Sequence, residues 1–190
     1  MAESLANPAA LRTVRSKTLS TRRAGPDRFS FESALEDVSS TGPDGDWREI
    51  VHRIAIRGSV LLPDLRLDGV EAVTEVMPYD LCPAAAAAVG GLHGLRIGPG
   101  YRRAVLDLMG GTAGCTHFLT LALELAQLHT LVLHQQMREA VPRVQRVDPA
   151  WMRAGLAIEP RLIGACATLR ADSPVILAAR SLDPPTARPR

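Results

Sequence analysis

The sequence has few cysteines, few aromatic residues and almost no excess of charge, and each shortage excludes a class of protein. The three cysteines, Cys82, Cys115 and Cys166, are too few for a disulfide framework, and an odd number cannot all pair within one chain. This cysteine content favours a cytoplasmic location. Aromatic residues make up 4% of the chain, which leaves few rings for a surface that stacks RNA bases. The net charge of +2 gives no field to draw the whole chain onto nucleic acid or a membrane.

The remaining composition is that of a globular protein. The chain has 190 residues, 46% hydrophobic and 22% charged, which is enough for one domain with a hydrophobic core. Residues 1–28 carry several arginines without hydrophobic periodicity and predict a flexible basic leader. We expect a single α+β domain over residues 29–180 and a flexible tail over residues 181–190.

The first half of the expected domain has the alternation of half-buried strands. Residues 29–38 and 50–57 alternate between apolar and polar side chains, and residues 65–76 do so with a bulge expected at Gly69. In the second of these strands, two arginines mark the solvent face, so His52 should point inward.

After residue 76 the hydrophobic pattern changes to the period of helices. Pro83 and an alanine run predict a short helix headed by Cys82, Tyr101–Met109 predicts another, and Cys115 opens a long helix that ends near Ala140. That helix is so apolar that a membrane span is an alternative interpretation of the segment. Its polar side chains share one narrow stripe, which favours a buried core helix in a protein without a membrane segment; they are His117, Thr120, Glu124, Gln127 and His134.

The end of the domain predicts a hairpin, with strands at 162–169 and 175–177. Strands first, helices after and a last hairpin indicate an α+β fold with a small antiparallel sheet.

Two thiols at predicted helix starts are the first candidates for chemistry. Cys115 lies two residues before His117, and the helix dipole favours the thiolate there, the form that is nucleophilic and binds metals. Cys82 has the same setting in the shorter helix. Inert buried cysteines and a capping histidine remain the alternative.

Taken with the inward His52, these thiols form a mixed nitrogen and sulfur set that zinc or iron would accept. The metal ligands that we predict are therefore His52, Cys82 and Cys115. The nearby acid–base candidates are Tyr79, Asp80, His117 and Glu124. No P-loop or dinucleotide fingerprint is present in the sequence, so no nucleotide cofactor is expected.

Several segments resemble a known family. The runs Asp68–Glu75, Cys82-Pro83, Leu92–Tyr101 and Gly114–Leu119 are similar to the bacterial domain-of-unknown-function family 2889. The resemblance is strong from His52 to about Gln136, poor before His52, and weak up to Cys166. The family implies no established activity.

The order of elements is also similar in pattern to NifU-type iron–sulfur scaffold proteins. In that scaffold, ligands come from a strand start and from the heads of two helices, which implies the positions of His52, Cys82 and Cys115 here.

These observations predict a metal-binding domain that acts as a metal-dependent lyase or hydrolase on a small apolar organic molecule. The bound group would be zinc, iron or an iron–sulfur cluster. An iron–sulfur carrier, a metal-free enzyme and a non-catalytic interaction domain stay open, as does a homo-oligomer.

Overall fold

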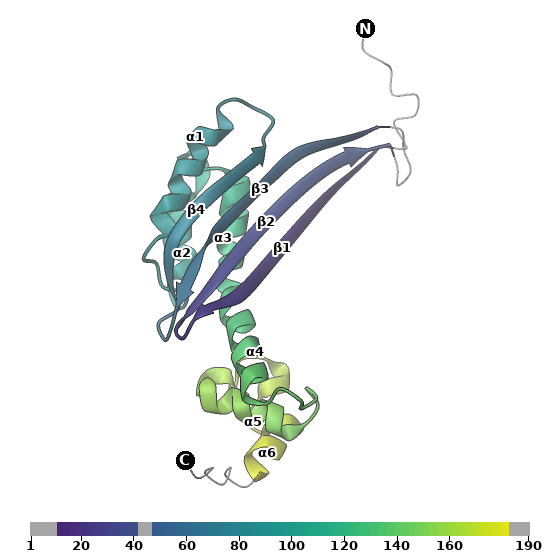
Figure 1. Cartoon of the computed structure of the whole chain (residues 1–190), viewed down its shortest axis with the longest axis vertical. Coiled ribbons are helices and arrows are strands. Elements are labelled where there is room, and N and C mark those ends of the chain that lie inside the picture. The colour runs from purple at the N-terminus through teal and green to yellow at the C-terminus, as the bar shows by residue number, and fades with distance from the viewer. Residues whose placement is uncertain (1–10, 42–46, 183–190) are drawn as a thin grey trace. The chain divides into compact units, whose positions relative to one another are not determined.

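A four-stranded antiparallel sheet forms the first part of the protein (Figure 1). The computed structural model describes residues 11–41 and 47–182. The strands lie in sequence order, β1-β2-β3-β4, and span β1 (Arg12–Gly25), β2 (Arg28–Ser40), β3 (Arg48–Leu61) and β4 (Arg66–Val76). The three strands expected from residue 29 onward are confirmed, each somewhat longer than the sequence pattern indicates.

Alternation along β2 separates the two faces of the sheet. Phe29, Phe31 and Leu35 are buried on the inner face. The outer face carries ion pairs between β2 and β3, with Glu32 bound to Arg57 at 2.5 Å and Glu36 bound to Arg53 at 2.7 Å. A charged outer face needs no cover, so one layer of helices is enough to complete the fold.

Helices and shorter 3-10 segments follow the sheet along the chain. The helices are α1 (Cys82–Ala86), α2 (Tyr101–Met109), α3 (Thr116–Glu124), α4 (Leu128–Ala140), α5 (Pro149–Ile158) and α6 (Pro174–Ser181). The 3-10 turns are η2 (Ala87–Leu92), η3 (Gly111–Ala113), η4 (Leu125–Gln127), η5 (Pro160–Leu162) and η6 (Ala167–Leu169). The predicted helices at Cys82, at 101–109 and from Cys115 are confirmed.

Helix α3 lies against β2 and β3 and forms the centre of the core. Phe118, Leu121 and Ala122 are buried there. The hydroxyl of Ser33 in β2 joins the sheet to α3, because it donates to the carbonyl of Leu121 at 3.4 Å. The hydroxyl of Tyr101 joins α2 to α3, because it donates to the carbonyl of Ala122 at 2.9 Å. This packing holds α3 against the inner face of the sheet.

The expected bulge in β4 is present. The pairing of β3 with β4 shifts between Arg57↔Glu71 and Ser59↔Asp68, and Gly69 has a positive φ of 57°. Glycine adopts this conformation without steric cost, so the bulge forms where the sequence supplies it.

The expected leader is the first correction. Residues 12–25 form β1, which pairs along its length with β2. β1 lacks the alternation of apolar and polar residues that predicts a strand, because it lies at the edge of the sheet. Polar and charged side chains are tolerated on both faces there and protect against aggregation. Residues 1–10 and 183–190, the ends of the expected leader and tail, lie outside the described residues.

Two compact units replace the single domain expected over residues 29–180. The first unit covers residues 1–129 and the second covers residues 130–190. In the second unit, Leu133, Met137 and Trp151 form a small core of their own, and the Asp148 carboxylate caps the start of α5. Each unit therefore has its own buried apolar cluster.

The expected final hairpin is also wrong. The first expected strand, residues 162–169, contains the last residue of η5 and all of η6. The second lies within α6, which spans Pro174–Ser181. Pro174 occupies the first turn of α6 and the hydroxyl of Ser173 accepts from the Ile176 amide, so this segment has a capped helix start instead of a strand.

The structure contains the long apolar helical segment, and the polar side chains along it lie in different environments. Thr116–Ala140 is long and apolar enough to cross a membrane by length and composition, which is weak support for a span because buried core helices pass the same test. Glu124 forms an ion pair with Lys17 of β1, whereas Gln127 and His134 are exposed. The predicted burial therefore applies to the apolar face of the helix and not to the whole stripe.

Candidate metal centre

Two strands bring an acid and an imidazole together on the inner face of the sheet. Asp37 of β2 is directly opposite His52 of β3 in the antiparallel register. The register shifts after Asp37, where β3 has one extra residue, and such bulges often redirect side chains beside functional sites. The Nδ1–H of His52 donates to Oδ2 of Asp37 at 2.9 Å. The inward orientation predicted for His52 is confirmed, because its side chain is only 12% exposed.

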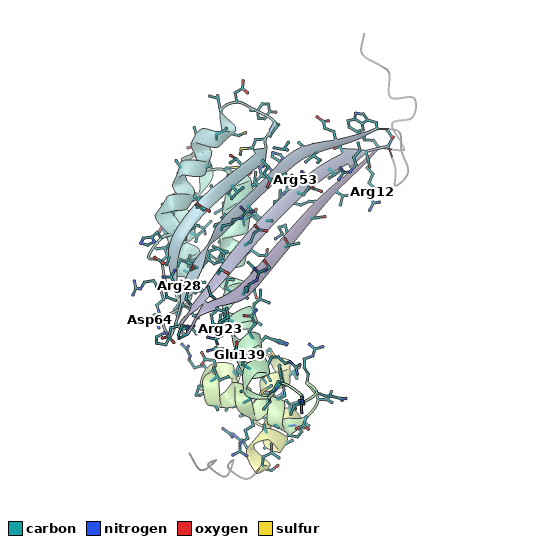
Figure 2. All side chains as sticks on the ribbon, viewed as in Figure 1. Arg12, Arg23, Arg28, Arg53, Asp64 and Glu139 are labelled. Atoms are coloured by element: carbon teal, nitrogen blue, oxygen red, sulfur yellow. The ribbon has the colours of Figure 1, made fainter. Side chains whose placement is uncertain are left out.

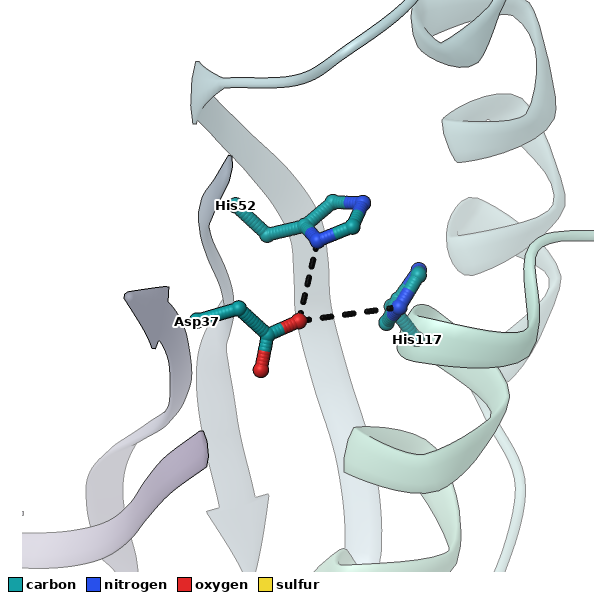
Figure 3. A group of neighbouring side chains, drawn as sticks. All are labelled: Asp37, His52 and His117. Carbon is teal, nitrogen blue, oxygen red and sulfur yellow. Dashed lines mark hydrogen bonds and ion pairs between the residues drawn. The ribbon is translucent and has the colours of Figure 1, made fainter. Parts of the chain in front are cut away.

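The first turn of α3 adds a second imidazole. Nε2 of His117 lies 3.8 Å from the same carboxylate oxygen of Asp37, and the rings of His117 and His52 are 3.9 Å apart between centroids (Figure 3). Cys115 is the N-cap residue of α3, as the sequence predicts. Its Sγ lies 3.6 Å from Nδ1 of His117, so the thiol borders the ring on the side away from Asp37.

Arg15 of β1 completes the environment of Asp37. Its guanidinium binds both carboxylate oxygens, with Nε at 2.6 Å from Oδ1 and Nη2 at 2.7 Å from Oδ2. These hydrogen bonds are the main cause of the lowered pKa of Asp37, and the hydrogen bond from His52 adds to them. Asp37 is therefore a fixed, buried carboxylate that stays ionised.

Burial favours the neutral form of His117. Desolvation is the largest cause of its lowered pKa, followed by the charges of His52 and Arg15. A neutral imidazole has a free lone pair, which a metal ligand or a general base requires.

The three groups have the composition and spacing of a metal site. One ligand atom from each of Asp37, His52 and His117 lies within 4.8 Å of the others. Two imidazoles and a carboxylate suit zinc or iron. No cysteine belongs to this group, although all three lie in the described part of the chain.

The structure brings together some of the predicted site residues. His52 and His117 meet at Asp37, and Cys115 borders His117. Cys82 is half-buried at the head of α1 and is not a member of the group, whereas Tyr79 and Asp80 are exposed on the segment before α1.

The last predicted site residue, Glu124, has another neighbour, because it is bound to Lys17. The third cysteine, Cys166, is exposed in the second unit.

Two residues of the site were missed. Asp37 follows Phe29, Phe31, Ser33 and Leu35 at alternate positions of β2, so an acid on the apolar face was a signal for a functional carboxylate. Arg15 gave no such signal, because its strand has no apolar face.

Comparison with protein families identifies the first unit. A family model described as protein of unknown function, DUF2889, matches residues 12–131. The chain belongs to this family. The match begins at β1, so the resemblance extends well before His52 and ends before Cys166. No curated protein and no solved structure matches the chain, and the similarity to NifU-type scaffolds has no support from these comparisons.

Proposed function

We propose that this DUF2889 protein is a metal-dependent enzyme for small molecules, in which Asp37, His52 and His117 hold a zinc or iron ion. The observation that carries the proposal is the convergence of three ligand atoms within 4.8 Å, from two strands and a helix that are far apart in sequence. The revised set keeps His52 from the sequence prediction and replaces both thiols.

The neighbours of the three residues suit a metal site. Metal-bound carboxylates and imidazoles are usually oriented by further hydrogen bonds. Arg15 orients Asp37, and the Cys115 thiol lies at the ring nitrogen of His117 that faces away from Asp37. Metal binding at Nδ1 of His52 would move its proton to Nε2 and replace the present hydrogen bond to Asp37.

Three protein ligands leave a coordination position for water or substrate. A metal ion in such a position lowers the pKa of bound water and polarises carbonyl groups, which supports hydrolase or lyase chemistry. The neighbouring inward positions on the two strands, Leu35 and Ile54, are buried apolar residues, and so is Phe118, which follows His117 in α3. A site on this apolar floor suits an organic substrate.

Metal affinity tests the proposal. Zinc binding by the full-length chain, measured in competition with a chromophoric chelator, should weaken at least about tenfold in Asp37→Asn and in His117→Ala. Cys82→Ala is the matched control and should bind zinc like the wild type. Equal affinity in the wild type and Asp37→Asn, or loss of zinc in Cys82→Ala alone, would contradict the proposed ligands.

One observation favours a second candidate, a metal-free acid–base enzyme. Asp37 already accepts from Arg15 and His52, an arrangement that orients His52 and leaves its Nε2 available as a base. Hydrolysis of p-nitrophenyl acetate separates the two functions. Activity that survives exhaustive chelation but is lost in His52→Ala would favour the metal-free enzyme, whereas activity lost on chelation and restored by zinc would favour the metal enzyme.

A further inference from the structure

Two ion pairs lie on the inner face of the sheet, one at the candidate metal centre and one beside it. Asp37 is neutralised by Arg15, and on the same face Lys17 is neutralised by Glu124. An imidazole that holds a metal ion is neutral, so Asp37, which Arg15 already binds, would be the one charged ligand of the three. A divalent ion held by Asp37 and two imidazoles would therefore add positive charge that no ligand residue offsets.

Uncompensated charge in a partly buried site is costly, and an anionic ligand would remove the cost. Arg15 offers a place for such a ligand. Its side chain is 45% exposed, and among the described residues only its Nε and Nη2 are engaged, both with Asp37. The donors of Nη1 and the second hydrogen of Nη2 remain for an incoming oxyanion, which a guanidinium binds in a fork.

We infer that the substrate of this site is an organic carboxylate, which binds the metal through one oxygen while Arg15 holds the anion from the side of β1. This inference rests on the proposed function and specifies its substrate class. It makes Arg15 a residue with two roles, orienting Asp37 and selecting a charged substrate over a neutral one.

Cobalt(II) in place of zinc gives a visible spectrum that changes when a ligand enters the coordination sphere. The experiment adds benzoate to the cobalt-loaded full-length chain, with benzamide as a neutral probe of the same size. Benzoate should change the spectrum in a saturable way, and benzamide should leave it unchanged at equal concentration. Arg15→Gln should weaken benzoate binding about tenfold or more, because a charge-assisted fork is lost.

Arg12→Gln is the matched control, since Arg12 lies on the same strand with its side chain on the opposite face, and benzoate binding should be unchanged. If Arg15→Gln takes up no cobalt, the comparison of benzoate with benzamide in the wild type still decides. Equal responses to the two probes, or none to benzoate, would overturn the carboxylate inference while the metal site stands. Cobalt binding that is absent, or unchanged in Asp37→Asn, would overturn the proposed function and the inference with it.

Discussion

His52 Nδ1 and Asp37 Oδ2 lie 2.9 Å apart, on neighbouring strands and in direct register. Sheet geometry sets this relationship, because directly opposite residues of an antiparallel pair point to the same face. The first turn of α3 then needs only to present His117 to make a three-residue site. The three side chains are thus carried on regular elements that pack through a buried core, which holds them in fixed positions.

The fork between Arg15 and Asp37 should contribute to stability. Arg15→Gln removes two charge-assisted hydrogen bonds from a buried carboxylate, and we expect a loss of about 1–2 kcal/mol in the free energy of unfolding. The exposed position of Arg15 keeps the loss below that of a fully buried pair. Urea denaturation of metal-free protein measures the change. Arg12→Gln should change stability by less than about 0.5 kcal/mol, and equal losses in the two variants would contradict the assignment.

The lowered pKa of His117 makes stability depend on pH. The folded protein favours the neutral ring, so the unfolded chain binds the proton more readily. The stability that this provides is present above the unfolded pKa of about 6.5 and is lost as the pH falls through the folded value. Metal-free wild type should therefore lose stability relative to His117→Gln between about pH 7.5 and pH 5. A difference that stays constant or grows in favour of the wild type would refute the assigned direction.

Glu124 should have a structural role only. Its carboxylate is bound to Lys17, both side chains are about one-third exposed, and it is not a member of the candidate metal group. Glu124→Gln should cost less than about 1 kcal/mol and leave zinc affinity unchanged. A tenfold loss of zinc affinity in this variant would show that the sequence-based assignment of Glu124 to the site was nearer the truth.

The sequence was most informative where a residue's environment is local. Alternating side chains located β2, β3 and β4, and Pro83 and the cap at Cys115 located the starts of two helices. The inward direction of His52 came from the arginines on the other face of its strand. These features depend on periods and caps that can be read within ten residues.

The rest depends on contacts that no local pattern contains. β1 is a strand because β2 pairs with it, although its own side chains are mostly exposed. The meeting of Arg15, Asp37 and His117 follows from the sheet register and from the packing of α3. Cys82 looked like a ligand because of its position at a helix start, a local property that says nothing about the neighbours of the thiol in space.

The identity of the metal-bound atoms is the central claim, and X-ray absorption spectroscopy of the zinc-loaded full-length chain tests it most directly. The proposed site predicts a first shell of nitrogen and oxygen at about 2.0–2.2 Å, with imidazole scattering from two histidines and no sulfur. That shell should lose an imidazole contribution in His117→Ala and remain intact in Cys82→Ala. A sulfur shell at about 2.3 Å in the wild type would contradict the Asp37, His52 and His117 site and would show that cysteine binds the metal, as the sequence predicts.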